Sequence, residues 1–187
     1  MSKRDDILNT ALELFIANGI EGTPTSLISK EAGVATGTLF HHFKTKEELI
    51  NALYIHLKED IVRSVSVDLR NTDTIKKKTM IMLLEFAKWA IANRNKYEYL
   101  QMAATSKYIE ESTVEQVNEL FSESKAVIEE GYRQGVFKIQ PPELFESIMH
   151  ANMYATVSYF IKHPDQFENE DIRNGAFESL WRALSDQ

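Results

Sequence analysis

The chain has 187 residues, 43% of them hydrophobic, with seven glycines, four prolines and no cysteine. This length can bury a core in one or two small domains, and the lack of cysteine excludes disulfides and thiolate metal sites. The net charge of −7 argues against unspecific adhesion to nucleic acid, and residues 1–47 are nearly neutral, with five Lys or Arg against six Asp or Glu.

The N-terminus does not indicate a signal peptide, and the hydropathy of the sequence does not indicate a membrane segment. The N-terminus MSKRDDILNT is charged and then amphipathic, unlike a signal peptide. The longest uncharged apolar-leaning stretch, residues 149–161, is interrupted by His150 and Asn152 and is too short to span a bilayer. We therefore expect a cytoplasmic protein without a membrane partner.

Residues 3–18 are predicted to form the first helix. Asp5 and Asp6 lie in its first turn, where carboxylates interact favourably with the helix dipole, and Gly19 follows its end. Its apolar side contains Ile7, Leu8, Ala11, Leu12, Leu14 and Phe15. We expect this helix to brace the two that follow it.

The stretch TPTSLISKEAGVATGTLFHHFKTK, residues 23–46, is interpreted as two short helices joined by a tight turn. Thr23 is the predicted N-cap with Pro24 as the first helical residue, and Thr25 is an alternative first residue. One side of this helix is apolar, with Leu27, Ile28 and Ala32. Gly33 is predicted to end it, because a left-handed backbone suits glycine.

The second short helix is predicted over residues 36–43. Leu39 and Phe43, four residues apart, are expected to face inward. The opposite side carries Thr36, Gly37, Phe40 and His41, flanked by Thr38 and His42. A helix held at a fixed angle by another, with one side free, is what a helix-turn-helix needs to enter a major groove.

The side chains on this free side suit contacts with a duplex. Gly37 allows close backbone approach, and Thr36, Thr38 and His41 can reach base edges through hydroxyl or imidazole groups. Lys46 and the N-terminal amides of the helices suit phosphates.

The run AGVATGTLFHHFKTKEELINALY resembles the signature of the TetR (tetracycline-repressor-like) transcriptional regulators, which reads approximately AGVSxGTLYxHFxxKExL. The preceding ILNTALELFIANGIEGTPT is similar to the first helix of that family and its connection. Two positions depart from the pattern. Ala35 replaces a serine that can help cap the recognition helix, and Phe40 replaces a tyrosine whose hydroxyl is directed at phosphate.

This resemblance implies a DNA-binding domain at residues 1–47 and a helical ligand-binding and dimerisation domain at 48–187. It implies phosphate and backbone contacts at Thr25, Gly37, His42 and Lys46, while Thr36, Thr38 and His41 would select the sequence. The full set of predicted DNA contacts is Thr25, Thr36, Gly37, Thr38, Phe40, His41, His42 and Lys46. The implied partners are a double-stranded operator, a second copy of the chain and a small-molecule inducer.

The rest of the chain is predicted to be helical throughout, which makes the fold class all-α. A capping box at 45–48 begins a helix that extends to about Arg70, and a strongly apolar helix is predicted over about 74–93. A second capping box at 112–115 predicts a helix that ends near Gly135. A shorter helix is predicted to end near residue 107. The last two helices are predicted over about 143–163 and 169–184.

Small residues form stripes on the last two predicted helices, and small stripes allow helices to approach closely. The stripes and their neighbours are Ala151, Ala155, Ser158, Ile172, Gly175, Ala176, Ser179, Leu180 and Ala183. In the TetR family the final two helices of each subunit pair into a four-helix bundle, so a symmetric dimer through these helices is expected. The alternative is that the stripes pack inside one subunit.

Methionine and aromatic side chains of the second domain are candidates for a ligand pocket, since flexible methionine beside aromatic rings suits an adaptable apolar cavity. The candidates are Met80, Leu84, Trp89, Tyr97, Met102, Tyr108, Phe121, Tyr132, Met149, Met153 and Phe160. Taken singly, each of them is better explained as an ordinary core residue than as a ligand contact.

The sequence favours a regulator over an enzyme. No two histidines lie four residues apart with a carboxylate between them, and no phosphate-binding glycine loop or nucleophile elbow is present. No metal site and no cofactor are therefore expected. A ligand-responsive repressor is the leading hypothesis. A helical protein-binding adaptor, or a transcriptional activator of the same fold, are the alternatives.

Overall fold

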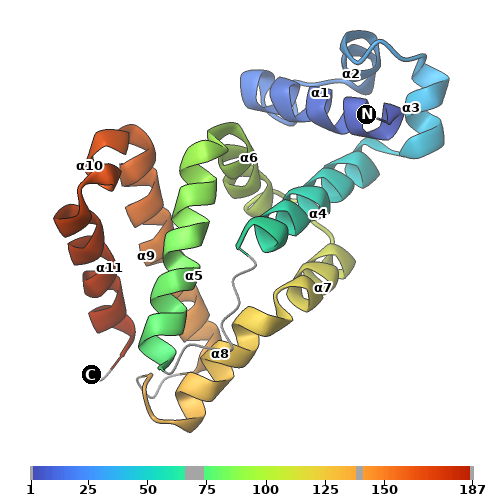
Figure 1. Ribbon diagram of the computed structural model, residues 1–187. Coiled ribbons are helices and arrows are strands. Elements are labelled where there is room, and N and C mark those ends of the chain that lie inside the picture. Colours follow the sequence, from blue (N-terminus) through green and yellow to red (C-terminus); the bar gives the residue numbers. More distant parts are fainter. Residues whose placement is uncertain (1, 66–73, 138–140, 186–187) are drawn as a thin grey trace. The chain divides into compact units, whose positions relative to one another are not determined.

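The computed structural model describes residues 2–65, 74–137 and 141–185 (Figure 1). These residues form helices, with one isolated antiparallel bridge between Phe137 and Ser185, so the all-α prediction is confirmed. No helix in the described ranges is long and apolar enough to cross a membrane.

The chain divides into two compact units that do not follow its linear order. The first unit contains Met1–Asp60 and Asn93–Leu120, and the second contains Ile61–Ala92 and Phe121–Gln187. The chain passes from the first to the second within α4 (Lys46–Val65). The functional division into residues 1–47 and 48–187 stays a prediction.

The first unit contains α1 (Lys3–Asn18), α2 (Thr25–Glu31), α3 (Thr36–His42), most of α4, α6 (Arg94–Ala104) and α7 (Glu111–Leu120). α1 packs against α2, α3 and α6. The rings of Phe15 and Tyr99 stack with their centroids 5.8 Å apart, and neither side chain is exposed. The Tyr99 hydroxyl donates to the Ile50 carbonyl oxygen at 3.0 Å, and burial raises the pKa of Tyr99. Helix α6 is therefore part of the core that supports α1.

Local signals fixed the boundaries of α1, which match the prediction. Ser2 is the N-cap, and its Oγ accepts from the Asp5 amide at 3.2 Å while Asp5 Oδ2 accepts from the Ser2 amide at 3.0 Å. Gly19 ends the helix with a φ of 74°, in the left-handed region that favours glycine.

Two predicted caps are wrong. Thr23 is fully buried and its hydroxyl donates to the Gly19 carbonyl oxygen at 2.8 Å, so Pro24 is the N-cap and α2 begins at Thr25, the alternative first residue. The capping box at 112–115 does not form, because α7 already begins at Glu111 and the Thr113 amide donates to the Glu110 carbonyl oxygen at 3.0 Å.

The helices also differ from the prediction in two places. One helix was predicted over 112–135, but Phe121, with a ψ of 20°, interrupts it, and α8 runs separately over Ser122–Arg133. A short helix α10 (Pro164–Glu168) was missed, because Pro164 ends the preceding helix and also occupies the first position of the next. The predicted end of α4 near residue 70 and the break at 71–73 lie outside the described residues.

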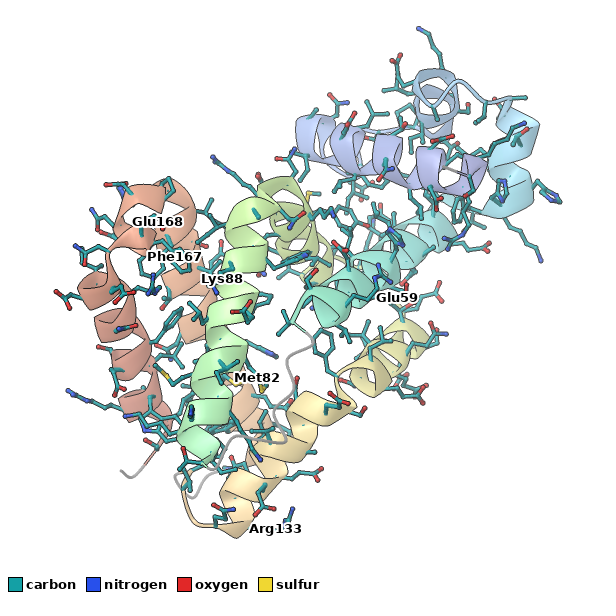
Figure 2. The ribbon with its side chains drawn as sticks, viewed as in Figure 1. Glu59, Met82, Lys88, Arg133, Phe167 and Glu168 are labelled. Carbon is teal, nitrogen blue, oxygen red and sulfur yellow. The ribbon has the colours of Figure 1, made fainter. Side chains whose placement is uncertain are left out.

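The second unit contains α5 (Ile75–Ala92), α8, α9 (Pro142–Lys162), α10 and α11 (Glu170–Leu184). α5 packs against α8, α9 and α11, and α9 packs against α11. Figure 2 labels Phe167 of α10, whose ring meets that of Phe160 of α9 edge to face with centroids 5.2 Å apart. Phe137, Phe145 and Trp181 form a second aromatic cluster, with centroids 4.7 Å apart for the two phenylalanines.

Candidate nucleic-acid interface

Helices α2 and α3 form the predicted helix-turn-helix. The Ala32 amide donates to the Ile28 carbonyl oxygen at 2.9 Å, and Gly33 then adopts a φ of 65°. The Val34 amide donates to the Ser29 carbonyl oxygen at 3.0 Å, and this hydrogen bond closes the turn. Helix α3 begins after Ala35, which provides no side-chain cap, as expected where serine is replaced.

The structure separates the two faces of α3 as predicted. Leu39 is fully buried and Phe43, at the C-cap, is 1% exposed. The opposite face contains Thr36, Gly37, Phe40 and His41, all exposed, with Thr38 and His42 half-buried at its edges. Phe40 is 42% exposed, a large apolar ring without cover in the isolated chain. The His41 and His42 rings meet edge to face, with centroids 5.5 Å apart.

Ser29 is a site residue that the sequence did not reveal. It lies on α2 and is 2% exposed, and its Oγ donates to the Ser26 carbonyl oxygen at 3.1 Å. The same Oγ lies 3.2 Å from Thr36 Oγ1 on α3. The two hydroxyl groups therefore join α2 to Thr36, the first residue of α3.

Lys46 and Thr25 stand at the ends of helices beside this face. The Lys46 ammonium donates to the Ile20 carbonyl oxygen at 2.6 Å, and Thr25 is the half-buried first residue of α2. The start of α4 is capped much as predicted. The Glu48 amide donates to Thr45 Oγ1 at 3.0 Å, while the Glu48 carboxylate accepts from the Lys44 amide at 2.7 Å rather than from that of Thr45.

Asn51 of α4 ties the loop between α6 and α7 to the helix that follows the interface. Its side chain is buried, at 6% exposed. Its Nδ2 donates to the carbonyl oxygens of Glu47 and Tyr108, both at 2.8 Å, and its Oδ1 accepts from the Glu110 amide at 3.0 Å. All four residues belong to the first unit. The sequence does not predict these three hydrogen bonds of Asn51.

The eleven predicted pocket residues are divided between the units. Tyr97, Met102 and Tyr108 belong to the first unit, and the other eight belong to the second. Met102 and Tyr108 line a shallow, open hollow together with residues 18–22. At its edge, hydrogen bonds from Tyr108 and Lys107 lower the pKa of Glu21, whose carboxylate lies 3.2 Å from the Lys107 ammonium.

In the second unit, Trp89, Met153 and Phe160 are buried in the core. The other members there are half-buried, namely Met80, Leu84, Phe121, Tyr132 and Met149. Their role as a pocket stays a prediction. Across residues 2–65, 74–137 and 141–185, no three metal-ligating side chains gather as an ion would require.

The small-residue stripes of α9 and α11 lie largely on the surface of the second unit. Six of their members are exposed, namely Ala151, Ala155, Ile172, Gly175, Ser179 and Ala183, and Ser158 and Ala176 are half-buried. Leu180 differs, because at 3% exposed its side chain belongs to the core of the unit rather than to that face. Large apolar side chains accompany the stripe on α9, with Leu144 50% and Tyr154 49% exposed.

Comparisons with known proteins agree with this geometry. The family model described as "Bacterial regulatory proteins, tetR family" matches residues 7–53. The fatty acid metabolism regulator protein of Bacillus subtilis (strain 168) is 30% identical over 77 residues, which cover 41% of this chain and 40% of that protein. The chain thus matches less than half the length of this curated relative.

Solved structures extend the similarity to the whole chain. FadR of Bacillus subtilis, determined in complex with stearoyl-CoA, shares the fold with a TM-score of 0.71 at 20% identity, over 94% of this chain and 96% of that one. A transcription regulator assigned to the tetR family from Shewanella sp. PV-4 is 31% identical, with a TM-score of 0.93 and 100% of both chains covered. This full-length similarity, together with the matched helix-turn-helix, shows that the chain belongs to the TetR family of transcription regulators.

Proposed function

We propose that the protein is a one-component repressor that binds a palindromic operator as a homodimer and releases it when a small apolar or amphipathic ligand binds. The observation that carries this proposal is the exposed face of α3, which is presented by the buried anchors Leu39 and Phe43. A protein with this task acts on the chromosome, in the cytoplasm.

The proposed contacts divide by role. Thr25, Gly37, His42 and Lys46 hold the phosphate backbone, and Thr36, Thr38 and His41 read base edges, while the Phe40 ring packs against the duplex. Phosphate contacts fix orientation, and base contacts select the sequence. Because residues 1–47 are nearly neutral, few phosphates meet a cation, and binding should depend only moderately on salt.

A second copy is required by the geometry of a palindrome, because two recognition helices must reach half-sites about 34–36 Å apart on one side of the duplex. The exposed face of α9 and α11 supports a dimer through these helices. Its small residues permit close helix approach, and Tyr154 and Ile172 leave apolar area that a partner would cover.

The ligand is proposed to bind among the methionine and aromatic side chains of the second unit. An amphipathic ligand class is supported by FadR of Bacillus subtilis, which was solved with stearoyl-CoA. A ligand weakens operator binding only if it prefers a state of the protein in which the two recognition helices no longer fit their half-sites, because equal affinity for both states changes nothing.

Selection from a randomised duplex library, followed by a gel shift on the DNA flanking its own gene, tests the DNA-binding part. We expect enrichment of a palindrome and a saturable shift, and the absence of any sequence preference would refute the proposal. Sedimentation at micromolar concentration should give a dimer. Compounds that raise the melting temperature should include one that weakens operator binding, and if none does, the ligand coupling is wrong.

A further inference from the structure

The hydroxyl oxygens of Ser29 and Thr36 lie 3.2 Å apart, and either of them could be the donor. The acceptors around the pair favour one of the two directions. A serine hydroxyl has one proton to donate, and a carbonyl oxygen can only accept. Ser29 Oγ donates to the Ser26 carbonyl oxygen at 3.1 Å, so its proton is used there. When Ser29 keeps that bond, Thr36 is the donor in the 3.2 Å contact, and this direction retains one more hydrogen bond than the reverse.

The surroundings of Ser29 keep this arrangement in place. Ser29 is 2% exposed, so water does not compete for its single proton. Helices α2 and α3 pack against each other, and Ile28 on α2 and Leu39 on α3 are both fully buried. Reversing the hydroxyl pair would require Ser29 to give up its bond to Ser26, which costs one hydrogen bond.

Thr36 is exposed and lies on the face proposed to enter the groove, but in the favoured direction its proton points inward to Ser29. In that direction the hydroxyl oxygen keeps a lone pair with which it can accept a hydrogen bond from DNA, whereas donating to DNA costs the bond from Ser29 to Ser26. Phosphate oxygens, guanine O6 and N7 and thymine O4 are all acceptors. The amino groups of adenine N6 and cytosine N4 are the donors that the major groove offers.

We propose that Thr36 is a specificity-determining residue that accepts a hydrogen bond from the amino group of an adenine or a cytosine, and that it does not contact phosphate. This inference rests on the proposed function. One hydrogen bond of this kind corresponds to a preference of about two- to tenfold for the amino-bearing base.

The experiment measures base preference at every operator position with a randomised library for the full-length protein and four variants. Thr36→Val keeps the shape of the side chain without the hydroxyl, and Thr36→Ser keeps the hydroxyl. Ser29→Ala removes the inward acceptor and frees the Thr36 proton. Ser26→Ala is the matched control, because Ser26 is exposed and takes part in the pair through its backbone carbonyl alone.

We expect one position in each half-site at which the natural protein prefers adenine or cytosine by about two- to tenfold. Thr36→Val should lose that preference, Thr36→Ser and Ser26→Ala should retain it, and Ser29→Ala should extend acceptance to guanine or thymine. A preference for guanine or thymine that Thr36→Val removes would overturn the inference. So would a uniform loss of affinity in Thr36→Val, which indicates a phosphate contact.

A measurement without DNA separates this inference from the proposed function. In the free protein, NMR should show a slowly exchanging Thr36 hydroxyl proton that Ser29→Ala abolishes and Ser26→Ala preserves. A rapidly exchanging Thr36 proton would refute the assignment even if the protein binds an operator. A protein that selects no sequence, while its Thr36 proton behaves as expected, would instead refute the proposed function.

Discussion

Replacing Asn51 by leucine should destabilise the first unit, because Asn51 bonds to two backbone groups of the α6–α7 loop. Asn51→Leu removes the donor to the Tyr108 carbonyl oxygen at 2.8 Å and the acceptor of the Glu110 amide at 3.0 Å. The Glu47 carbonyl oxygen retains its place in the hydrogen-bond ladder of α4. The Tyr108 carbonyl oxygen and the Glu110 amide are thus left without these partners, while leucine has the same branched arrangement of heavy atoms as asparagine.

Each stranded backbone group costs about 1–3 kcal/mol when it stays buried. Tyr108 is half-buried and Glu110 is exposed, so water compensates part of this cost. We expect a loss of about 2–3 kcal/mol in the free energy of unfolding. At about 2–4 °C per kcal/mol for a chain of this size, the melting temperature should fall by about 5–10 °C.

Thermal unfolding followed by circular dichroism measures this difference, and Asn95→Leu is the matched control. Asn95 lies exposed on α6 in the same unit, so its replacement should change the stability by less than about 0.5 kcal/mol. Hydrogen exchange gives a local readout, because the Glu110 amide should be protected in the natural protein and lose protection in Asn51→Leu. Equal melting temperatures, or unchanged exchange at Glu110, would refute the reasoning.

Three further predictions follow from other parts of the molecule. His41→Ala should change the base preference at one operator position, at a cost of about 1–3 kcal/mol, and an unchanged preference across a randomised library would remove His41 from the interface. Gly131→Ala should lower stability by about 1 kcal/mol in urea unfolding, because an added Cβ would overlap the Phe137 ring, whereas Gly37→Ala, with open space around its Cβ, should not. Burial lowers the pKa of Lys58 from 10.5 to about 8, so the unfolded state binds more protons between these values. The stability of the natural protein should therefore rise with pH across that window relative to Lys58→Met, and parallel pH profiles would contradict this.

The sequence revealed those parts of the fold that depend on neighbouring residues. The bounds of α1 were predicted correctly, because carboxylates in its first turn and Gly19 at its end are local signals. The faces of α3 were predicted from the four-residue spacing of Leu39 and Phe43. The prediction of Thr23 as a cap is wrong, because nothing in the local pattern shows that its hydroxyl is buried and donates to the carbonyl oxygens of Leu14 and Gly19.

Contacts between distant segments were not accessible in this way. Asn51 bonds to residues 57 and 59 positions further along the chain, and a lone asparagine on an amphipathic helix does not indicate such partners. Ser29 and Thr36 lie seven positions apart on different helices, so their contact depends on how those helices cross. The candidate interface residues could be named from the sequence, whereas the groups that orient them required the structure.

The stacking of Phe15 against Tyr99 has a consequence for protein engineering. Exchanging the first 47 residues between regulators of this family would separate that ring pair, because Phe15 is transferred and Tyr99 is not. The transplanted residues 1–47 would then pack against the α6 of another protein, whose side chains are not complementary to theirs. Chimaeras should therefore carry residues 93–120 along with the amino-terminal segment, as a discontinuous cassette.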